Sequence, residues 1–243
     1  MKPTATIPVR FPEDIQLFTQ KSHNFAAALE SPSVKESANY LVVFTNNNNT
    51  FTESARTRVV NGTKLAVINL DNSTLIAVAE NGARKNNFHE KSGIYQFGGD
   101  GLVKIQSLDM HYARDVLFWK VHDEIYLAVA QFKSDRSGLE VPIYKWLGKH
   151  FDLVQRLGAT GARKITHFVI DGASFLAVAN FKNSENKTRI YSDVYKYEYH
   201  VEKYELYQRI LTQACSDIQV FTFRSDRKKD TFLVVANSYD FGK

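Results

Sequence analysis

The sequence predicts an all-β fold built from repeated four-stranded antiparallel sheets, and three observations support this. The chain of 243 residues carries 17 Phe and 12 Tyr against 2 Met, and aromatic residues favour strands. In each complete repeat, a recurring apolar run lies among three further strand-like runs in a fixed order. Repeats of about 50 residues with four strands each are typical of β-propeller blades. The clearest copies of the recurring run are LIAVAEN at 75–81, YLAVAQF at 126–132, FLAVANF at 175–181 and FLVVANS at 232–238.

Each run has its own pattern, which the segment 162–210 illustrates. The first run (162–170) and the fourth (204–210) alternate apolar and polar residues, as half-buried strands do. The second run (175–181) is continuously apolar, which predicts a strand covered on both faces. The third run (193–197) carries a recurring tyrosine. Turn-forming residues such as Asp171-Gly172 separate the runs.

The repeats divide the whole chain. We predict one propeller domain or partial domain, with four complete repeats and a fifth that holds only the first two runs. A ring of four and a half blades leaves two readings open: the chain is a fragment of a larger ring, or it closes as five blades with an incomplete last blade. The approximate repeat bounds are 12–58, 62–108, 113–157, 162–210 and 215–243.

Short motifs recur in the same order: Ala-Arg in the first run, LAVAN in the second, IYKW in the third and a glutamine in the fourth, most clearly over 113–181. This set resembles the epilepsy-associated repeat, also called the EAR or EPTP repeat. The family includes the leucine-rich glioma-inactivated proteins and a thrombospondin-type laminin G domain protein. The resemblance implies a seven-bladed propeller, a secreted protein and a protein-binding function without catalysis.

The composition argues against several other functions. Lys and Arg outnumber Asp and Glu by 31 to 26 but are scattered, whereas nucleic-acid-binding domains concentrate them on one face. The densest basic run, 227–229, is flanked by Asp226 and Asp230, so we interpret it as a solvated turn rather than a phosphate-binding patch. No apolar stretch approaches the length of a membrane-spanning helix. The amino terminus shows no apolar core of a signal peptide.

No recognised catalytic motif is present, so we predict that the protein is not an enzyme. The segment GGDG (98–101) falls at a predicted hairpin turn rather than in a phosphate-binding loop. His167 lies alone on a predicted strand, and we expect a structural role for it. Cys215 is interpreted as a buried small residue, with an inter-chain disulfide as the alternative.

A polar position recurs near the start of the first run. Its residues are Asp14, Lys64, Asp115, Lys164 and Asp217. If the first strands line a central channel, these charges gather at one channel mouth. They then either neutralise one another or form a carboxylate site for a hard cation such as Ca²⁺. Such a metal site would use Asp14, Asp115 and Asp217, and no cofactor is otherwise expected.

Partner binding is expected on loops rather than on strands. The loops between second and third runs (31–38, 81–92, 133–141 and 182–192) and the linkers between repeats (58–62, 108–112, 158–162 and 211–214) lie at the same end of a propeller. The alternative is that these are variable solvated loops. The candidate contact residues are Arg84, Lys85, Phe88, His111, Tyr112, Lys133, Asp135 and Arg136.

Four N-x-[ST] sequons fall in predicted loops or turns, where a glycan could be accepted. They are Asn48, Asn61, Asn72 and Asn186. With the resemblance, they favour an extracellular recognition module that binds a receptor or matrix protein, with neither nucleic-acid binding nor membrane insertion. An intracellular propeller scaffold is the main alternative. An enzyme with its site in the channel is less favoured.

Overall fold

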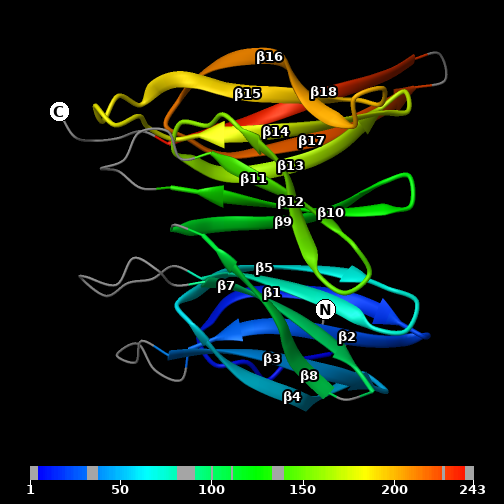
Figure 1. Ribbon diagram of the computed structural model, residues 1–243. Coiled ribbons are helices and arrows are strands. Elements are labelled where there is room, and N and C mark those ends of the chain that lie inside the picture. The colour runs from blue at the N-terminus through cyan, green and yellow to red at the C-terminus, as the bar shows by residue number, and fades with distance from the viewer. Residues whose placement is uncertain are drawn as a thin grey trace. The chain divides into compact units, whose positions relative to one another are not determined.

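The computed structural model describes residues 5–31, 38–80, 91–99, 101–110, 112–132, 140–225 and 228–238. Over these residues the chain forms 18 β-strands, arranged in antiparallel sheets (Figure 1). Among the described residues, no helix has the length and hydrophobicity to cross a membrane. The chain divides into two compact units, Met1–Phe118 and Trp119–Lys243.

The first unit contains two complete four-stranded sheets whose strands follow chain order. Sheet 1 consists of β1 (Pro12–Gln20), β2 (His23–Glu30), β3 (Ala38–Asn47) and β4 (Thr50–Val60). Sheet 2 consists of β5 (Gly62–Asn69), β6 (Thr74–Glu80), β7 (Lys91–Gly98) and β8 (Gly101–Asp109).

The second unit contains the remaining strands, except for the start of β9. Sheet 3 consists of β9 (Ala113–Val121), β10 (Glu124–Gln131), β11 (Val141–Trp146) and β12 (Phe151–Leu157). Sheet 4 consists of β13 (Ala162–Ile170), β14 (Ala173–Asn180), β15 (Arg189–Glu198) and β16 (Lys203–Gln213). Sheet 5 pairs only β17 (Cys215–Ser225) with β18 (Lys228–Asn237).

The predicted fold class is confirmed: the described chain forms four four-stranded antiparallel sheets and one two-stranded sheet, in repeated order. The four runs of each complete repeat are the four strands of one sheet, and the two runs of the fifth repeat are β17 and β18. The sheets span 12–60, 62–109, 113–157, 162–213 and 215–237, beside predicted repeats of 12–58, 62–108, 113–157, 162–210 and 215–243. The choice between a larger ring and five blades stays a prediction.

Two β-bulges recur at fixed places. The first lies near the start of the first strand, for example between Ala162 and Lys164 in sheet 4 and between Gly62 and Lys64 in sheet 2. The second lies beside the recurring tyrosine of the third strand, as at Tyr195. A bulge re-aims the side chains that follow it. The repeating polar position found in the sequence therefore comes directly after a bulge.

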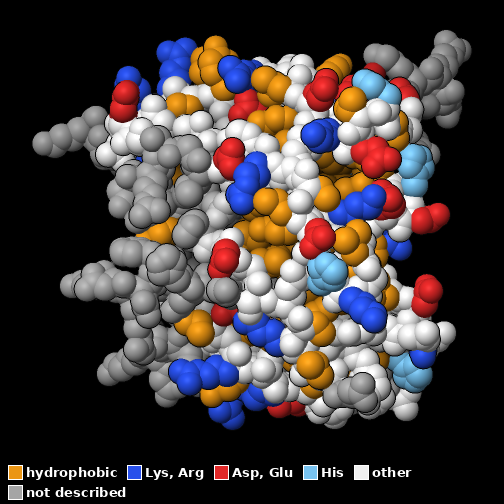
Figure 2. All heavy atoms as spheres, viewed as in Figure 1, with side chains coloured by type: hydrophobic (Ala, Val, Ile, Leu, Met, Phe, Trp, Pro, Cys, Tyr) orange, Lys and Arg blue, Asp and Glu red, His pale blue; other side chains and the backbone are white. Residues whose placement is uncertain are grey.

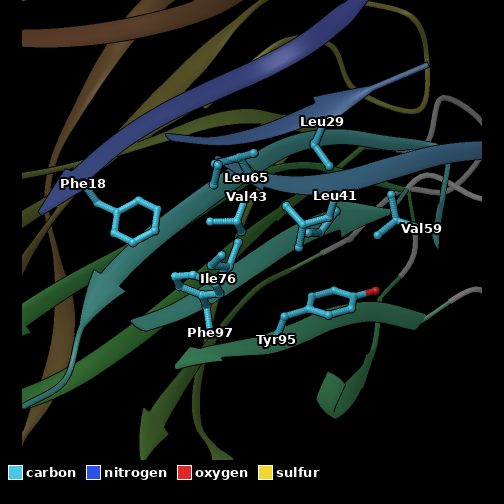
Figure 3. Packing of buried hydrophobic residues seen from close by; sticks show 11 residues of the cluster. Phe18, Leu29, Leu41, Val43, Val59, Leu65, Ile76, Tyr95 and Phe97 are labelled. Atoms are coloured by element: carbon cyan, nitrogen blue, oxygen red, sulfur yellow. The ribbon is translucent and has the colours of Figure 1, made fainter. Parts of the chain in front are cut away.

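The second strand of each complete sheet is buried, as its continuous apolar sequence predicts. In the first unit, its side chains join a core between sheets 1 and 2, which Figure 3 shows from close by. Phe18, Leu29, Leu41 and Val43 reach this core from sheet 1, and sheet 2 contributes Leu65, Ile76, Tyr95 and Phe97 among others. Burial of this apolar surface holds the two sheets together.

An aromatic pair stacks across the first two strands of several sheets. In sheet 1 the rings of Phe18 and Phe25 lie 5.2 Å apart, and Phe97 of sheet 2 meets both edge-on. In the second unit Tyr197 of sheet 4 likewise meets Tyr126, which stacks on Trp119. The third-strand aromatic of one sheet thus covers the stacked pair of the sheet before it. In sheet 5 the pair Phe221–Phe232 is 50% and 46% exposed.

Gln155, the copy of the recurring fourth-strand glutamine in sheet 3, joins sheet 3 to sheet 4. Gln155 on β12 donates from Nε2 to the carbonyl oxygen of Tyr204 at 2.6 Å and accepts from its backbone N–H at 2.9 Å. Tyr204 belongs to β16, so this one side chain fixes sheet 3 to the fourth strand of sheet 4. A two-point contact of this kind accounts for a glutamine at this position.

Candidate partner-binding surface

Most of the predicted contact residues lie outside the described residues. They are Arg84, Lys85, Phe88, His111, Lys133, Asp135 and Arg136. Tyr112 is described, half-buried, with a φ of 54°. The loop after β14 (181–188) and the linker before β13 (158–161) are described in full. We call the end of a sheet that carries the loop after its second strand and the linker before its first strand the loop end. The opposite end, which carries the hairpins after the first and third strands, is the turn end.

A polar residue closes the second strand at the loop end and binds the linker before its own sheet. The side chains of Glu30, Glu80, Asn180 and Asn237 accept hydrogen bonds from the backbone N–H groups of Arg10, Val60, Thr160 and Gln213, at 3.0–3.1 Å. We call these contacts linker clamps. Sequence reasoning missed them, although the position is Glu, Glu, Gln, Asn and Asn in the five repeats. A polar residue that always ends an apolar strand was the available signal.

A stacked arginine lies beside the clamp of sheet 4. The Arg163 guanidinium carbon lies 3.3 Å from the centre of the Phe181 ring and 5.2 Å from that of Phe132. In sheet 4 the arginine of the Ala-Arg motif thus gains cation–π attraction from two rings. Gly161 is next to it with a φ of 68°, where a Cβ atom would lie 2.4 Å from the Lys182 carbonyl oxygen.

The loop after β14 is closed by its own hydrogen bonds. Asn183 Oδ1 accepts from the backbone N–H groups of Glu185 and Lys187, at 3.0 and 2.9 Å. The Phe181 N–H donates to the Gly161 carbonyl oxygen at 3.0 Å, which ties the start of the loop to the linker. The backbone of this loop is therefore held both by its own turn and by the linker.

A recess of about 360 Å³ opens between this loop, the linker and the first residues of β15. Its walls carry three basic side chains and one exposed aromatic ring, that of Tyr191, which is 52% exposed. Asp193 and Arg209 lie opposite each other on β15 and β16. The lining consists of Thr160, Asn183, Lys187, Arg189, Ile190, Tyr191, Asp193 and Arg209.

Asp193 is the buried polar group of the recess, with 8% of its surface exposed. Its Oδ2 accepts a hydrogen bond from Asn180 Nδ2 at 3.0 Å. Its Oδ1 lies 3.4 Å from Arg209 Nε and has no hydrogen-bond partner among the described residues. Burial raises the pKa of the Asp193 carboxyl, while the Arg209 charge and the Asn180 hydrogen bond act against the rise. Burial and the Asp193 charge also raise the pKa of Tyr195 to about 12.

The other repeats serve as internal comparisons for this recess. Counting from the recurring tyrosines Tyr95, Tyr144 and Tyr195, the position of Asp193 holds Gly93 and Pro142 in the preceding sheets. The same sheet can therefore form without a carboxylate there. An unusual buried charge that the fold does not require is a candidate functional group.

A second recess, of about 610 Å³, lies at the turn end of sheet 4. Its lining includes Tyr199, whose hydroxyl donates to the Gly172 carbonyl oxygen at 3.1 Å, and His122, whose ring lies 5.2 Å from the Tyr199 ring. The two recesses of sheet 4 are thus at opposite ends of the same strands. In Figure 2, basic, acidic and hydrophobic side chains alternate over the viewed face of each unit.

Two of the three carboxylates predicted to bind a cation accept hydrogen bonds from protein groups. Asp14 accepts from Lys64 Nζ at 3.3 Å and from the Leu65 N–H at 3.0 Å, which is one instance of the predicted charge neutralisation. Asp217 accepts from Gln219 Nε2, and Asp115 is buried. Over the part of the chain that the structure describes, no group of three or more His, Cys, Asp or Glu residues could hold a metal. The Ca²⁺ site stays a prediction.

The predicted sequons lie at turns. Asn48, Asn72 and Asn186 are exposed, whereas Asn61 is half-buried before the fully packed Gly62. Asn186 Oδ1 accepts from Lys182 Nζ at 2.9 Å. Three of the four side chains are therefore open to modification in the folded chain.

The other residues considered for chemistry have structural surroundings. His167 Nε2 lies 3.0 Å from the Ser174 hydroxyl, which is buried and also hydrogen-bonded to Tyr204. Burial lowers the pKa of His167 to about 4. Cys215 is fully buried, and burial raises the pKa of its thiol. Gly98 and Gly101 pair at the hairpin that joins β7 to β8, where the sequence predicts a turn.

These repeated antiparallel sheets, joined by aromatic and glutamine contacts, define a repeat protein of the β-propeller class. Residues 150–198 match the family model of the EPTP domain. This match confirms the resemblance to the EPTP repeat found in the sequence.

Two curated relatives agree with this assignment. The chain is 33% identical over 153 residues to the mouse thrombospondin-type laminin G domain and EAR repeat-containing protein, and 32% identical over 152 residues to the human one. The matches cover 62% and 61% of this chain and 22% of each relative. The chain thus spans about a fifth of the length of these relatives.

Solved structures show likeness in fold alone. The GH43_1 enzyme from Xanthomonas citri complexed with xylotriose matches with a TM-score of 0.51 at 8% identity, over 95% of this chain and 83% of that one. The endo-arabinase from Bacteroides thetaiotaomicron matches with a TM-score of 0.50 at 9% identity, over 99% and 97%. At such identities the function of these enzymes does not transfer.

Proposed function

We propose that this chain is a non-enzymatic recognition module that binds a receptor or matrix protein outside the cell through the loop ends of its sheets. The EPTP repeat supports a protein-interaction role, and the named relatives combine such repeats with a laminin G domain. The recess at the loop end of sheet 4 is the observation that carries the proposal. It joins an exposed tyrosine to arginines on strands whose ends are fixed by the linker clamp.

The composition of the recess fits a protein partner. Tyrosine and arginine are enriched in protein interfaces, and a few such residues supply most of the binding energy. Tyr191 presents a large, partly apolar ring, and Arg189 and Arg209 flank it. Because hydrogen bonds already close the backbone of the neighbouring loop, binding requires little further ordering of that loop.

The same lining does not favour hydrolysis. Glycoside hydrolases that share this fold class use two carboxylates facing the scissile bond. Asp193 is the one carboxylate in the lining of the recess, and it lies against Arg209. The proposal therefore assigns binding rather than catalysis to this end of the sheet.

The test is binding of the purified chain, fused to an antibody Fc, to animal cells and to deposited matrix, measured by flow cytometry and plate assay. We expect Tyr191→Ala to reduce binding at least tenfold, because a tyrosine that acts as a binding hot spot contributes about 2 kcal/mol or more, and tenfold corresponds to about 1.4 kcal/mol. Tyr199→Ala is the matched control, an exposed tyrosine at the turn end of the same sheet. Melting temperatures check that both variants fold. Equal binding by the wild type and the Tyr191 variant would remove the loop end of sheet 4 from the proposal.

A further inference from the structure

We propose that the recess at the loop end of sheet 4 binds an extended acidic segment of the partner, with two of its carboxylates on Arg209 and Arg189. The inference rests on the proposed function and names the chemistry of the partner. It follows from how Asp193 holds Arg209, from the spacing of the two arginines, and from the ring between them.

Arg209 is oriented for a second carboxylate. Asp193 approaches it at Nε, at 3.4 Å, and the arginine side chain is 61% exposed. An arginine can pair with a carboxylate along the edge formed by its two terminal nitrogens, which gives two parallel hydrogen bonds. The buried Asp193 thus acts as a positioning residue, which holds the guanidinium while that outer edge faces the recess.

Arg189 provides the second cationic point. Alternate residues of a strand share a face, so Arg189, Tyr191 and Asp193 lie along one face of β15, before the bulge at Tyr195. Four residues of strand separate the positions of Arg189 and Asp193, a span of roughly 13 Å. The third basic residue of the lining, Lys187, pairs with Glu185 at 2.6 Å. The recess therefore has a positive lining with its two arginines at separated ends.

This spacing selects an extended peptide. Two acidic residues four positions apart in an extended chain are separated by the same roughly 13 Å. The residue midway between them, whose side chain points to the same face, would lie on the Tyr191 ring. A single phosphate or carboxylate is too small to reach both arginines. Among polyanions, an acidic polypeptide with an apolar residue at the midpoint uses all three features of the recess.

The probe is a synthetic heptapeptide with two glutamates four residues apart and a leucine midway, labelled for fluorescence anisotropy. A peptide of the same composition with adjacent glutamates is the spacing control. We expect measurable binding of the first peptide that weakens as salt rises, because the charges are partly exposed and screened. We expect Arg189→Gln and Arg209→Gln each to weaken it about tenfold, since each removes a charge-assisted hydrogen bond. Arg156→Gln, at the equivalent position of sheet 3, should leave binding unchanged.

The Asp193→Asn variant tests whether Asp193 acts by holding Arg209 in place rather than by contact with the peptide. It keeps the shape of the side chain and removes its charge, so Arg209 loses its fixed orientation. We expect weaker peptide binding and a reduced preference between the two peptide spacings. A simple structural role would instead change the melting temperature without changing that preference.

The outcomes are distinguishable from those of the proposed function. The inference is overturned if the two arginine variants bind the peptide as the wild type does, if the two spacings bind equally, or if a heparin fragment binds while the peptide does not. Binding to cells or matrix that needs Tyr191 but neither arginine would overturn the inference and leave the proposed function standing. Circular dichroism and melting temperatures establish that each variant is folded.

Discussion

Burial lowers the pKa of His167 and raises the pKa of Asp193. The two shifts therefore have opposite effects on how stability depends on pH. The His167 pKa is lowered to about 4 from 6.5, so the folded state keeps the ring neutral where the unfolded state would bind a proton. The Asp193 pKa is raised, so the folded state disfavours its charge. Folding is therefore more sensitive to acid because of the first residue, and carries a penalty at neutral pH because of the second.

His167→Phe is expected to make stability less dependent on pH. In the wild type, the His167 contribution is complete above pH 6.5 and is lost as pH falls through 6.5 towards 4, up to roughly 3 kcal/mol for this shift. Phenylalanine occupies the equivalent position of sheet 3, at Phe118, so the sheet accommodates it. Urea unfolding at pH 7 and pH 4.5 measures the effect. An equal loss of stability in both proteins would contradict the assignment.

Asp193→Asn is expected to raise the free energy of unfolding at pH 7. The folded-state pKa is above its unfolded value of 3.8, so the charged form is disfavoured by folding and a neutral side chain of the same shape removes that penalty. The gain should shrink as pH falls and the wild-type carboxyl becomes protonated. Urea unfolding at pH 7 and pH 3.5 tests both statements. A large loss at pH 7 would show that the Arg209 pair outweighs burial.

At the scale of the element, the loop end of sheet 4 depends on a tight backbone turn. Gly161→Ala is expected to destabilise the protein by about 1–3 kcal/mol, because its φ is positive and the added Cβ would lie 2.4 Å from a backbone oxygen. Gly172→Ala is the matched control, since its φ is 82° with nothing within 4 Å of the Cβ. Urea unfolding of both variants separates the clash from the dihedral strain. Equal losses of unfolding free energy in the two variants would mean that the structure around residue 161 shifts to relieve the clash with the backbone oxygen.

The linker clamps give a second element-scale prediction. Asn180→Ala removes the acceptor of the Thr160 N–H and the donor to Asp193, and leaves buried polar groups without partners. We expect a loss of about 1–3 kcal/mol in unfolding free energy. Asn72→Ala, at an exposed asparagine in the turn between β5 and β6, is the control and should change it little. An unchanged free energy of unfolding in the Asn180 variant would show that water replaces the hydrogen bonds of the clamp.

The sequence predicted the elements well because each strand carries its own pattern. Continuous apolar runs became the buried second strands, and turn residues such as Asp171-Gly172 separated them. The bulges and clamps escaped prediction, because they depend on which residues pair across strands and linkers. The recess escaped it for the same reason. Asp193 and Arg209 are 16 positions apart in the sequence and meet only through the register of β15 with β16.

At the scale of the whole molecule, the sequons test the proposed compartment. When the chain is expressed with a secretion signal in animal cells, we expect glycans at the exposed Asn48, Asn72 and Asn186 and lower occupancy at the half-buried Asn61. Mass spectrometry of glycopeptides measures occupancy at each site. Conversion of each sequon threonine to alanine identifies the signals. Absence of glycans at all four sites would favour the intracellular scaffold.

The linker clamp also bears on how such a chain could have grown. Each clamp joins the segment before a sheet to the end of the second strand of that same sheet, and sheet 5 has one although it is only a hairpin. A duplicated gene segment that encodes one hairpin with its linker would therefore carry both partners of its own linker clamp. Gain or loss of a repeat by recombination would leave the linker clamps of the other repeats intact. The number of repeats could therefore change in evolution without new contacts between a sheet and its linker.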